Sequence, residues 1–472
     1  MTDIKLTPEA VAFTTGLTYD DLPPEALRIA RRCVMDGLAV MLGGTEQEAL
    51  RIMSRYIDSV GGTGDARLIG AASRRVPAHL AALWHGLAGH AMDWDDTQLS
   101  ENPGRLYGLL THPTIPPLAA CLSVSDLLGG VDGKRFLTAF NAGFEVECKI
   151  AECISPDHYV KGFHTSGTIG TFGSAAAAAN LLALDGTQTA HAIGIAASLA
   201  AGIRVNFGTM TKPLHVGRSS ENGVTAALLA REGFTADKDG LDGQWGYIAV
   251  AGRGGEPELV AGRFGKPLTI VSPGVSIKPY PCGVLTHPSM DAMLKVMKDH
   301  ALTPDDIEKV TLFAGSNILN PIRYPIAKTE LEGKFCMAFL LAAIIIAGRA
   351  GKREFTDGFV LSAPVQAMQK RIGTEYDQSI EDMGWDRIRS RVEVWTKDGK
   401  HIVEWADENY RGGPHNPMSD AEVEDKLRDC AAGILDDARL AKAMEAVWGL
   451  DDLADVSVLL ELLDWNAPVG GS

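Results

Sequence analysis

The sequence lacks several features that would assign it to common functional classes. No apolar run reaches the roughly 18 residues that cross a bilayer, and the longest apolar block covers only 337–348. The N-terminus has no basic region followed by an apolar stretch, so no signal peptide is expected. Basic residues are outnumbered 44 to 60, and the resulting net charge of −16 repels nucleic-acid phosphates and anionic lipids at long range. We therefore expect a cytoplasmic protein with no nucleic-acid or membrane partner.

Cysteine is also scarce. The chain has seven cysteines among 472 residues, an odd number spread thinly along its length, which suits a reducing compartment better than a disulfide framework. Cys148 and Cys153 form the only close pair, and no other cysteine stands at the spacing of a zinc or iron–sulfur site. We expect buried or spare thiols, with no structural disulfide and no sulfur-ligated cluster.

The residues that are present predict a helical first part. A length of 472 residues favours two or three domains at about 150 residues each. Up to about residue 250, apolar side chains recur three and four positions apart, and Thr7 before Pro8 is typical of a helix start. The clearest predicted helices cover 76–95, 116–128, 133–154, 171–184 and 221–232. The first part is therefore predicted to be an all-α domain.

Beyond a Gly- and Pro-rich stretch at 252–274, strand patterns appear. Alternating residues at 391–396 and 401–405 flank Asp398-Gly399 and predict a β-hairpin with a two-residue turn. A capping box at 419–422 then starts new helices. The predicted fold is mainly α. A large all-helical domain, residues 1–272 plus 407–472, carries an inserted smaller α+β lid domain, residues 273–406.

The segment 90–97 is the first candidate for chemistry. On a continuous helix, His90, Asp93 and Thr97 share one face. An imidazole, a carboxylate and a hydroxyl would then point the same way, as proton transfer to or from a carbon acid requires. The same residues also fit a solvated acidic helix end. A magnesium motif like that of helical terpenoid synthases is disfavoured, because no second metal motif follows and the other polar motifs are basic.

Two histidines lie in loops that lead into helices. Pro113 favours an extended conformation for His112 at a helix entrance, where a histidine often has a merely structural role. His164 lies in the glycine-rich segment 162–173, whose glycines fall three apart instead of following the dinucleotide-binding pattern. Such glycines favour close helix packing, with an anion site at the helix N-terminus as the alternative.

Two lysines are candidates for binding a carboxylate. Lys212 precedes Pro213, which places it just outside the positive end of a predicted helix, where an anion would relieve the repulsion between like charges. Lys278 lies in the proline-stiffened segment 277–283, and this rigidity aims its side chain at low entropic cost. Each also fits an ordinary structural or surface position.

Taken together, these motifs resemble the MmgE/PrpD family, whose members include 2-methylcitrate dehydratase, cis-aconitate decarboxylase and iminodisuccinate epimerase. The resemblance covers nearly the whole chain and its motifs occur in the same order. The matching segments are 90–97, 112–113, 162–173, 208–215, 278–282, 331–335 and 416–419.

The resemblance implies a helical domain with an inserted lid, a homodimer, and an active site between the domains that uses no metal and no organic cofactor. It implies catalytic roles for Asp93, His112, His164 and Lys212 of the helical domain and for Lys278 of the lid, with Thr97 and His215 contacting substrate. We expect the two lysines to hold substrate carboxylates, and the aspartate and the catalytic histidines to exchange protons.

Two departures from the family pattern affect the expected substrate. Decarboxylase members carry a histidine five residues after the lid lysine, where this chain has Gly283. The segment 98–111 is longer than in characterised members and carries Glu101 and Arg105.

These features predict a cofactor-independent lyase or isomerase acting on a small di- or tricarboxylate. A 2-methylcitrate dehydratase-like reaction is our first expectation, and an epimerase or isomerase of an iminodisuccinate- or aconitate-like acid is the second. A non-catalytic carboxylate-binding homologue is the alternative from another class. The acidic net charge is compatible with an anionic substrate, because a small acid in a cleft responds to the cations within a Debye length of about 8 Å.

Overall fold

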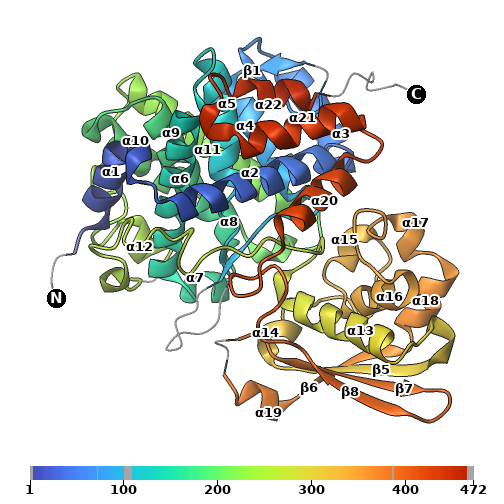
Figure 1. Ribbon diagram of the computed structural model, residues 1–472. Helices are drawn as coiled ribbons and strands as arrows, with labels where there is room; N and C mark the ends of the chain where they lie inside the picture. The colour runs from blue at the N-terminus through green and yellow to red at the C-terminus, as the bar shows by residue number, and fades with distance from the viewer. Residues whose placement is uncertain (1–3, 72, 100–108, 253, 385–386, 465–472) are drawn as a thin grey trace. The chain divides into compact units, whose positions relative to one another are not determined.

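A computed structural model describes residues 4–71, 73–99, 109–252, 254–384 and 387–464. The described chain divides into two compact units (Figure 1). The first contains residues up to 99, residues 109–275 and residues from 419 onward, and the second contains residues 276–418. The second unit ends after residue 418 instead of the expected 406, because this last stretch packs on the unit's first residues. The hydroxyls of Ser276 and Tyr410 lie 2.7 Å apart.

The first unit is built almost entirely from helices. The long ones are α1 (Leu6–Gly16), α2 (Pro24–Gly44), α3 (Glu48–Val60), α4 (Ala78–Ala91), α5 (Ile115–Leu127), α6 (Gly133–Ile154), α9 (Gly170–Leu181), α10 (Gly186–Leu199), α11 (Thr211–Arg231), α20 (Asp420–Ala431) and α21 (Asp437–Trp448). Shorter helices are α7 (Asp157–Val160), α8 (Thr165–Thr168), α12 (Tyr247–Val250) and α22 (Ser457–Leu462). Two small antiparallel pairs accompany them, β1 (Ala66–Arg67) with β2 (Arg75–Val76) and β3 (Gln98–Leu99) with β4 (Leu109–Thr111).

The centre of this unit is a cluster of helices whose residues are buried on nearly every side. Helices α4, α5, α9 and α11 pack against one another, and almost every residue of α5 and α9 is buried. The C-terminal helix α20 lies along α2 (Figure 1). This mainly α architecture confirms the prediction. The apolar side chains that recur at helical spacing along the sequence pack against neighbouring helices.

The start of α1 corrects the predicted cap at Thr7. The helix begins at Leu6, and the side chain of Asp242 accepts the backbone N–H groups of Leu6 (2.7 Å) and Thr7 (2.8 Å). The Thr7 hydroxyl instead accepts the backbone N–H of Leu241 at 3.1 Å. The cap therefore comes from a residue far away in the sequence, which a local pattern does not show.

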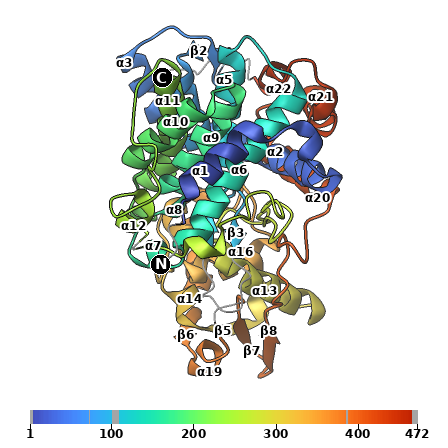
Figure 2. The same cartoon turned by 90° about the vertical axis from the view of Figure 1, so that its left-hand side faces the viewer.

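The second unit contains a four-stranded sheet with helices on it. Its elements are α13 (His287–Asp299), β5 (Ile307–Ala314), α14 (Ser316–Leu319), α15 (Glu330–Gly333), α16 (Met337–Ala347), α17 (Asp357–Val360), α18 (Ala363–Gln369), β6 (Ile372–Tyr376), α19 (Gln378–Glu381), β7 (Ser390–Thr396) and β8 (His401–Trp405). The strand order is β6-β5-β7-β8, with β5 parallel to β6 and antiparallel to β7. Helices α13 and α16 pack together over one face of the sheet (Figures 1 and 2).

The predicted hairpin forms from β7 and β8, but its turn is longer than expected. The Thr396 N–H donates to the Lys400 carbonyl at 3.0 Å, so that three residues, 397–399, form the loop. Gly399 has a φ of +84°, the left-handed conformation that closes a three-residue hairpin loop. The prediction that Gly399 belongs to the hairpin turn is confirmed, and the predicted turn length of two residues is wrong.

The interior of both units is mostly apolar. The longest apolar block of the sequence forms α16, an 11-residue helix whose side chains are mostly buried. None of the helices in the described ranges has both the length and the apolar character needed to cross a membrane. All seven cysteines are buried.

Candidate active site

The candidate site begins where α4 ends. The helix stops at Ala91, and Asp93 adopts a left-handed conformation with a φ of +55°, which aspartate tolerates better than most residues. The Asp93 N–H donates to the His90 carbonyl at 3.1 Å. The prediction that His90, Asp93 and Thr97 share one helical face is therefore wrong. Asp93 and Thr97 lie beyond the end of the helix, in the stretch that leads into β3.

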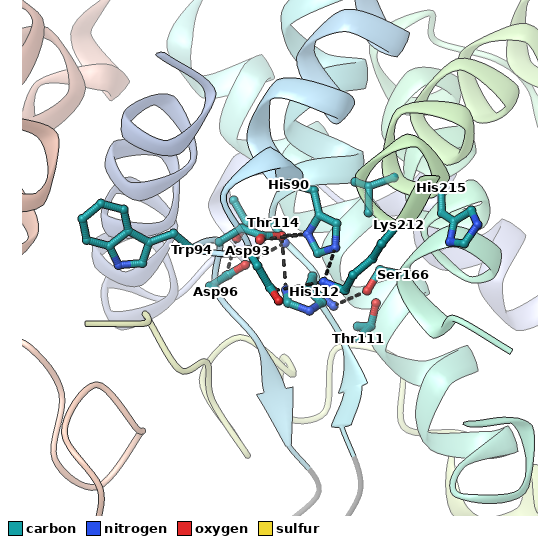
Figure 3. A network of polar contacts seen from close by, with 12 residues as sticks. His90, Asp93, Trp94, Asp96, Thr111, His112, Thr114, Ser166, Lys212 and His215 are labelled. Atoms are coloured by element: carbon teal, nitrogen blue, oxygen red, sulfur yellow. Dashed lines mark hydrogen bonds and ion pairs between the residues drawn. The ribbon is translucent and has the colours of Figure 1, made fainter. Parts of the chain in front are cut away.

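Lys212 brings His90 and Asp93 together from another helix. It is the second residue of α11, inside the first turn instead of just before it. Its ammonium Nζ lies 2.9 Å from His90 Nε2 and 3.1 Å from Asp93 Oδ1 (Figure 3). All three side chains are buried. The predicted proximity of these groups thus arises through a lysine that lies more than a hundred residues away in the sequence.

The contacts of His90 determine which of its ring nitrogens carries the proton. An ammonium group only donates, so His90 Nε2 accepts the hydrogen bond from Lys212. The proton of the neutral ring is then on Nδ1, which donates to Asp95 at 2.8 Å. Burial, assisted by Lys212, lowers the pKa of His90 to about 3 although Asp95 opposes this shift. His90 is therefore a neutral link between an ammonium and a carboxylate.

Asp95 also contacts a second histidine. His112 Nδ1 lies 3.2 Å from Asp95 Oδ2, and the rings of His90 and His112 meet edge to face with centroids 4.6 Å apart. Burial opposes ionisation of Asp95, but His112 and His90 outweigh it and hold the pKa of this carboxyl well below its usual range. Asp95 is thus a buried carboxylate shared by two imidazoles.

The loop that carries His112 is itself firmly held. His112 lies between β4 and α5, as predicted, and its backbone N–H donates to the Ser166 hydroxyl at 3.0 Å. The hydroxyl of the preceding Thr111 donates to Glu147 Oε1 at 2.5 Å, and burial raises the pKa of Glu147 well above its usual range. The position of the imidazole is therefore fixed by contacts on both sides of the residue.

His164 and His215 form a second imidazole pair beside the first. Their Nδ1 atoms lie 3.0 Å apart, and the His164 ring stacks on His90 with centroids 5.5 Å apart. Burial, with a contribution from Lys212, lowers the pKa of His215 to about 4 and that of His164 well below its usual range. A Cβ added at Gly167 would lie 2.6 Å from His215 Cβ. This glycine therefore permits the close packing that its spacing predicted.

The remaining predicted residues lie in different places. Thr97 is fully buried in the first unit, and its hydroxyl has no hydrogen-bond partner among the described residues. Lys278 is buried in an irregular segment of the second unit, and its catalytic role stays a prediction. Gly283, also in the second unit, has open space where a Cβ would be. Glu101 and Arg105 lie outside the described residues.

The cluster also has the composition of a metal site. His90, Asp93, Asp95 and His112 each offer one ligand atom, and these four atoms lie within 4.8 Å of one another. Two nitrogens and two oxygens form a donor set that zinc accepts. However, the Lys212 ammonium already contacts His90 and Asp93, so a cation of the protein itself neutralises one of the two carboxylates, while Asp95 is held by the two imidazoles. The arrangement can therefore exchange protons without a metal ion.

The fold and the site define a mainly α protein with a buried acid–base cluster built around a lysine. The chain matches the MmgE/PrpD N-terminal domain over residues 9–260 and the MmgE/PrpD C-terminal domain over residues 280–450. It belongs to the MmgE/PrpD family. Cis-aconitate decarboxylase of Homo sapiens is 28% identical over 458 residues, which cover 96% of this chain and 93% of that protein. The protein of the same name from Aspergillus terreus is 26% identical over 498 residues, covering 98% and 96%.

Two residues of the cluster, Asp95 and Ser166, are not among the residues predicted from the sequence. On an uninterrupted helix Asp95 would point away from Asp93, so its contact with the histidines is not visible in the helical pattern. Ser166 is one of several small polar residues in a glycine-rich segment, and nothing local distinguishes it. A useful signal was present, because both residues lie inside motifs that carry the family resemblance.

Proposed function

We propose that this protein is a lyase or isomerase that moves a proton on a carbon next to a carboxylate group of a small tricarboxylic or dicarboxylic acid. The observation that carries this proposal is the buried contact of the Lys212 ammonium with His90 and Asp93, surrounded by further imidazoles. Relatives named for cis-aconitate support a tricarboxylate as the substrate class.

The chemistry explains why such a cluster is useful. A proton next to a carboxylate is weakly acidic, and its removal leaves an enolate with a second negative charge. At about 4 Å and an effective dielectric constant near 20, one cation contributes on the order of 4 kcal/mol of gross Coulomb energy. We assign this stabilisation to Lys212, and by resemblance to Lys278. Asp93, His112 and His164 are the candidate acids and bases, and Thr97 a hydrogen-bond donor to substrate.

We consider two candidate reactions on such acids. Dehydration of a 2-methylcitrate-like hydroxy acid is our first candidate, because decarboxylase members of the family carry a histidine where this chain has Gly283. Decarboxylation of a cis-aconitate-like acid is the second, and the names of the relatives favour it. The open space at Gly283 makes Gly283→His a direct test, since a gain of decarboxylation in this variant would assign the difference to one residue.

The experiment that tests the proposal follows proton NMR of cis-aconitate, citrate and 2-methylcitrate incubated with the protein in deuterium oxide. We expect deuterium at a carbon next to a carboxylate of at least one acid, and Lys212→Met should abolish it. An alkene product identifies dehydration, released carbon dioxide identifies decarboxylation, and exchange alone identifies an epimerase or isomerase. Thermal stabilisation by these acids without any exchange would contradict the proposal and identify a binding protein.

A further inference from the structure

We propose that His215 is a positioning residue that accepts a hydrogen bond from the Nδ1–H of His164 and thereby holds His164 Nε2 unprotonated, ready to act as the base. This inference deepens the proposed function and rests on it for its catalytic consequence. The tautomer itself is a property of the resting protein and is testable without substrate.

The two rings are held in place by backbone contacts. The His164 N–H donates to the Gly202 carbonyl at 3.0 Å. His215 lies against two glycines, because a Cβ on Gly202 would lie 3.3 Å from His215 Cγ and one on Gly167 would lie closer still. Because His215 is three residues after Lys212 on α11, one face of this helix carries both side chains. Helix α11 therefore presents a cation to His90 and an imidazole to His164.

The Nδ1 atoms of His164 and His215, 3.0 Å apart, require one donor and one acceptor. Both rings are neutral near pH 7, since burial lowers the pKa of each, to about 4 for His215. A neutral imidazole has one N–H and one lone pair. If His164 donates, its Nε2 carries a lone pair. If His215 donates, His164 Nε2 carries a proton.

The surroundings of His164 favour the first arrangement. His164 Nε2 is buried with no hydrogen-bond partner in the described part of the chain, and a buried side-chain N–H without an acceptor is costly and uncommon. The groups that act electrostatically on this ring are Lys212 and His215 of α11, His90 of α4 and His112 of the loop before α5, and all four would repel a positive charge on it. The positive field of the Lys212 ammonium favours a lone pair over an N–H at the unpaired nitrogen.

For the reaction, this tautomer fixes which nitrogen of His164 accepts the proton of the substrate. The proton of the substrate C–H bond moves to His164 Nε2, and the electron pair of that bond stays on the substrate as the enolate. The resulting imidazolium keeps its Nδ1–H, which still donates to His215 Nδ1. His215 therefore neither gains nor loses a proton. Its lone pair accepts the same hydrogen bond before and after the transfer, and this contact keeps the His164 ring from rotating.

The first test is nitrogen NMR of the full-length protein labelled with ¹⁵N-histidine, without ligand, near pH 7. The His164 signals are assigned by their loss in His164→Asn. We expect a protonated Nδ1 and an unprotonated Nε2 in the native chain, and a mixture of the two tautomers in His215→Leu. A protonated Nε2 in the native chain would overturn the inference. This result stands whether or not any tested acid is turned over.

The second test compares two variants of His215 in the deuterium-exchange reaction. His215→Leu removes the acceptor, so we expect kcat to fall by part of the roughly 100- to 10,000-fold that a positioned base contributes, with KM nearly unchanged. His215→Asn provides an amide that accepts a hydrogen bond, and we expect it to restore most of kcat.

The matched control is His191→Asn, because in the described part of the chain His191 Nδ1 hydrogen-bonds with the backbone of Ala236 and the variant should keep full activity. Equal losses of kcat in both His215 variants, with equal losses of thermal stability, would show a structural role and overturn the inference. Full activity in His215→Leu would overturn it too. If the native chain exchanges no acid at all, the proposed function fails, while the NMR result still decides the tautomer.

Discussion

Two buried lysines contact the same short loop, residues 92–97, and they do so in different ways. The Lys212 ammonium contacts the side chains of His90 and Asp93. The Lys426 ammonium lies 2.5 Å from Asp36 Oδ1 and donates to the Trp94 carbonyl at 2.6 Å. In Figure 3 the Trp94 side chain points away from the histidines, and Lys426 lies over its ring, 5.1 Å from the centroid.

The difference lies in what each lysine contacts. Lys426, in α20, contacts the backbone carbonyl of Trp94 in the loop and the carboxylate of Asp36 in α2. It therefore links the loop to two helices that are far apart in the sequence. Lys212 contacts an imidazole and a carboxylate of the cluster, and an anionic substrate could compete with that carboxylate for the ammonium. Burial and charge alone are therefore a poor guide to function. The partners of a buried lysine distinguish a support from a reactive group.

The largest effect that this comparison predicts is on activity. We expect Lys212→Met to lower kcat/KM by at least the roughly 100- to 1,000-fold lost when one preorganised charge-stabilising group is removed, because the Lys212 ammonium contacts both His90 and Asp93. Turnover of the acid identified by NMR is measured and expressed per folded molecule. Lys426→Met is the matched control, and it should keep most of its activity per folded molecule. Equal losses in the two variants would contradict the distinction between them.

The next effect is on stability. Lys426→Met should lower the free energy of unfolding by about 3–5 kcal/mol, because it leaves the Asp36 carboxylate buried without its partner. Urea denaturation followed by circular dichroism measures this change. The control is Lys295→Met, which breaks an exposed pair with Glu404 and should change the stability far less, because solvent screens exposed pairs. An unchanged denaturation midpoint in Lys426→Met would show that the buried pair contributes nothing.

A double variant separates the charge pair from the backbone contact. In Lys426→Met with Asp36→Leu no buried charge is left alone, and replacing buried ion pairs by apolar residues is often neutral or stabilising. We expect the double variant to be more stable than Lys426→Met, with a remaining loss of about 1–3 kcal/mol because the Trp94 carbonyl loses its donor. The measurement is a double-mutant cycle of unfolding free energies. Strictly additive losses would show that Asp36 and Lys426 do not interact.

Much of the helical unit follows from local sequence patterns. Helix α6 has the predicted bounds, residues 133–154, because an aspartate cap precedes a long amphipathic run. The capping box of Ser419 and Glu422 forms at the start of α20 as predicted. Local sequence patterns mispredicted the ends of helices whose stabilising contacts come from residues that are distant in the sequence. Asp242 caps α1, and helix α4 ends at Ala91 although its apolar pattern continues to Asp95.

The same physical reason limits prediction of the site. The structure brings Asp93, His112, His164 and Lys212 together within one unit, and each had been selected from its motif. Their contacts were not predictable, because the left-handed Asp93 and the approach of Lys212 to His90 depend on how α4 packs on α11. Lys426 had no motif at all. Its function as a support follows only from the packing of α20 beside α2.

The smallest effect concerns Asp96, which lies next to the shared carboxylate Asp95. Burial, with a contribution from Asp36, raises the pKa of Asp96 to about 8, and its carboxyl contacts the Thr114 hydroxyl at 2.6 Å. Between the ordinary value of 3.8 and the raised one, the folded chain holds a proton that the unfolded chain has released, so this group lowers stability as pH rises.

Asp96→Asn does not ionise, and its stability relative to the native chain should therefore increase between pH 6 and pH 7 by about 1 kcal/mol, close to the limit for one proton. Urea denaturation at the two pH values measures this difference, and thermal melts over the same range give an independent estimate. Asp20→Asn, an exposed aspartate of the same unit, is the control and should show no such trend.

If the difference between Asp96→Asn and the native chain stays constant from pH 6 to pH 7, Asp96 is already ionised in the fold. Its carboxylate would then add to the negative charge that Lys426 and Lys212 balance, and the two lysines would be electrostatically coupled through the loop.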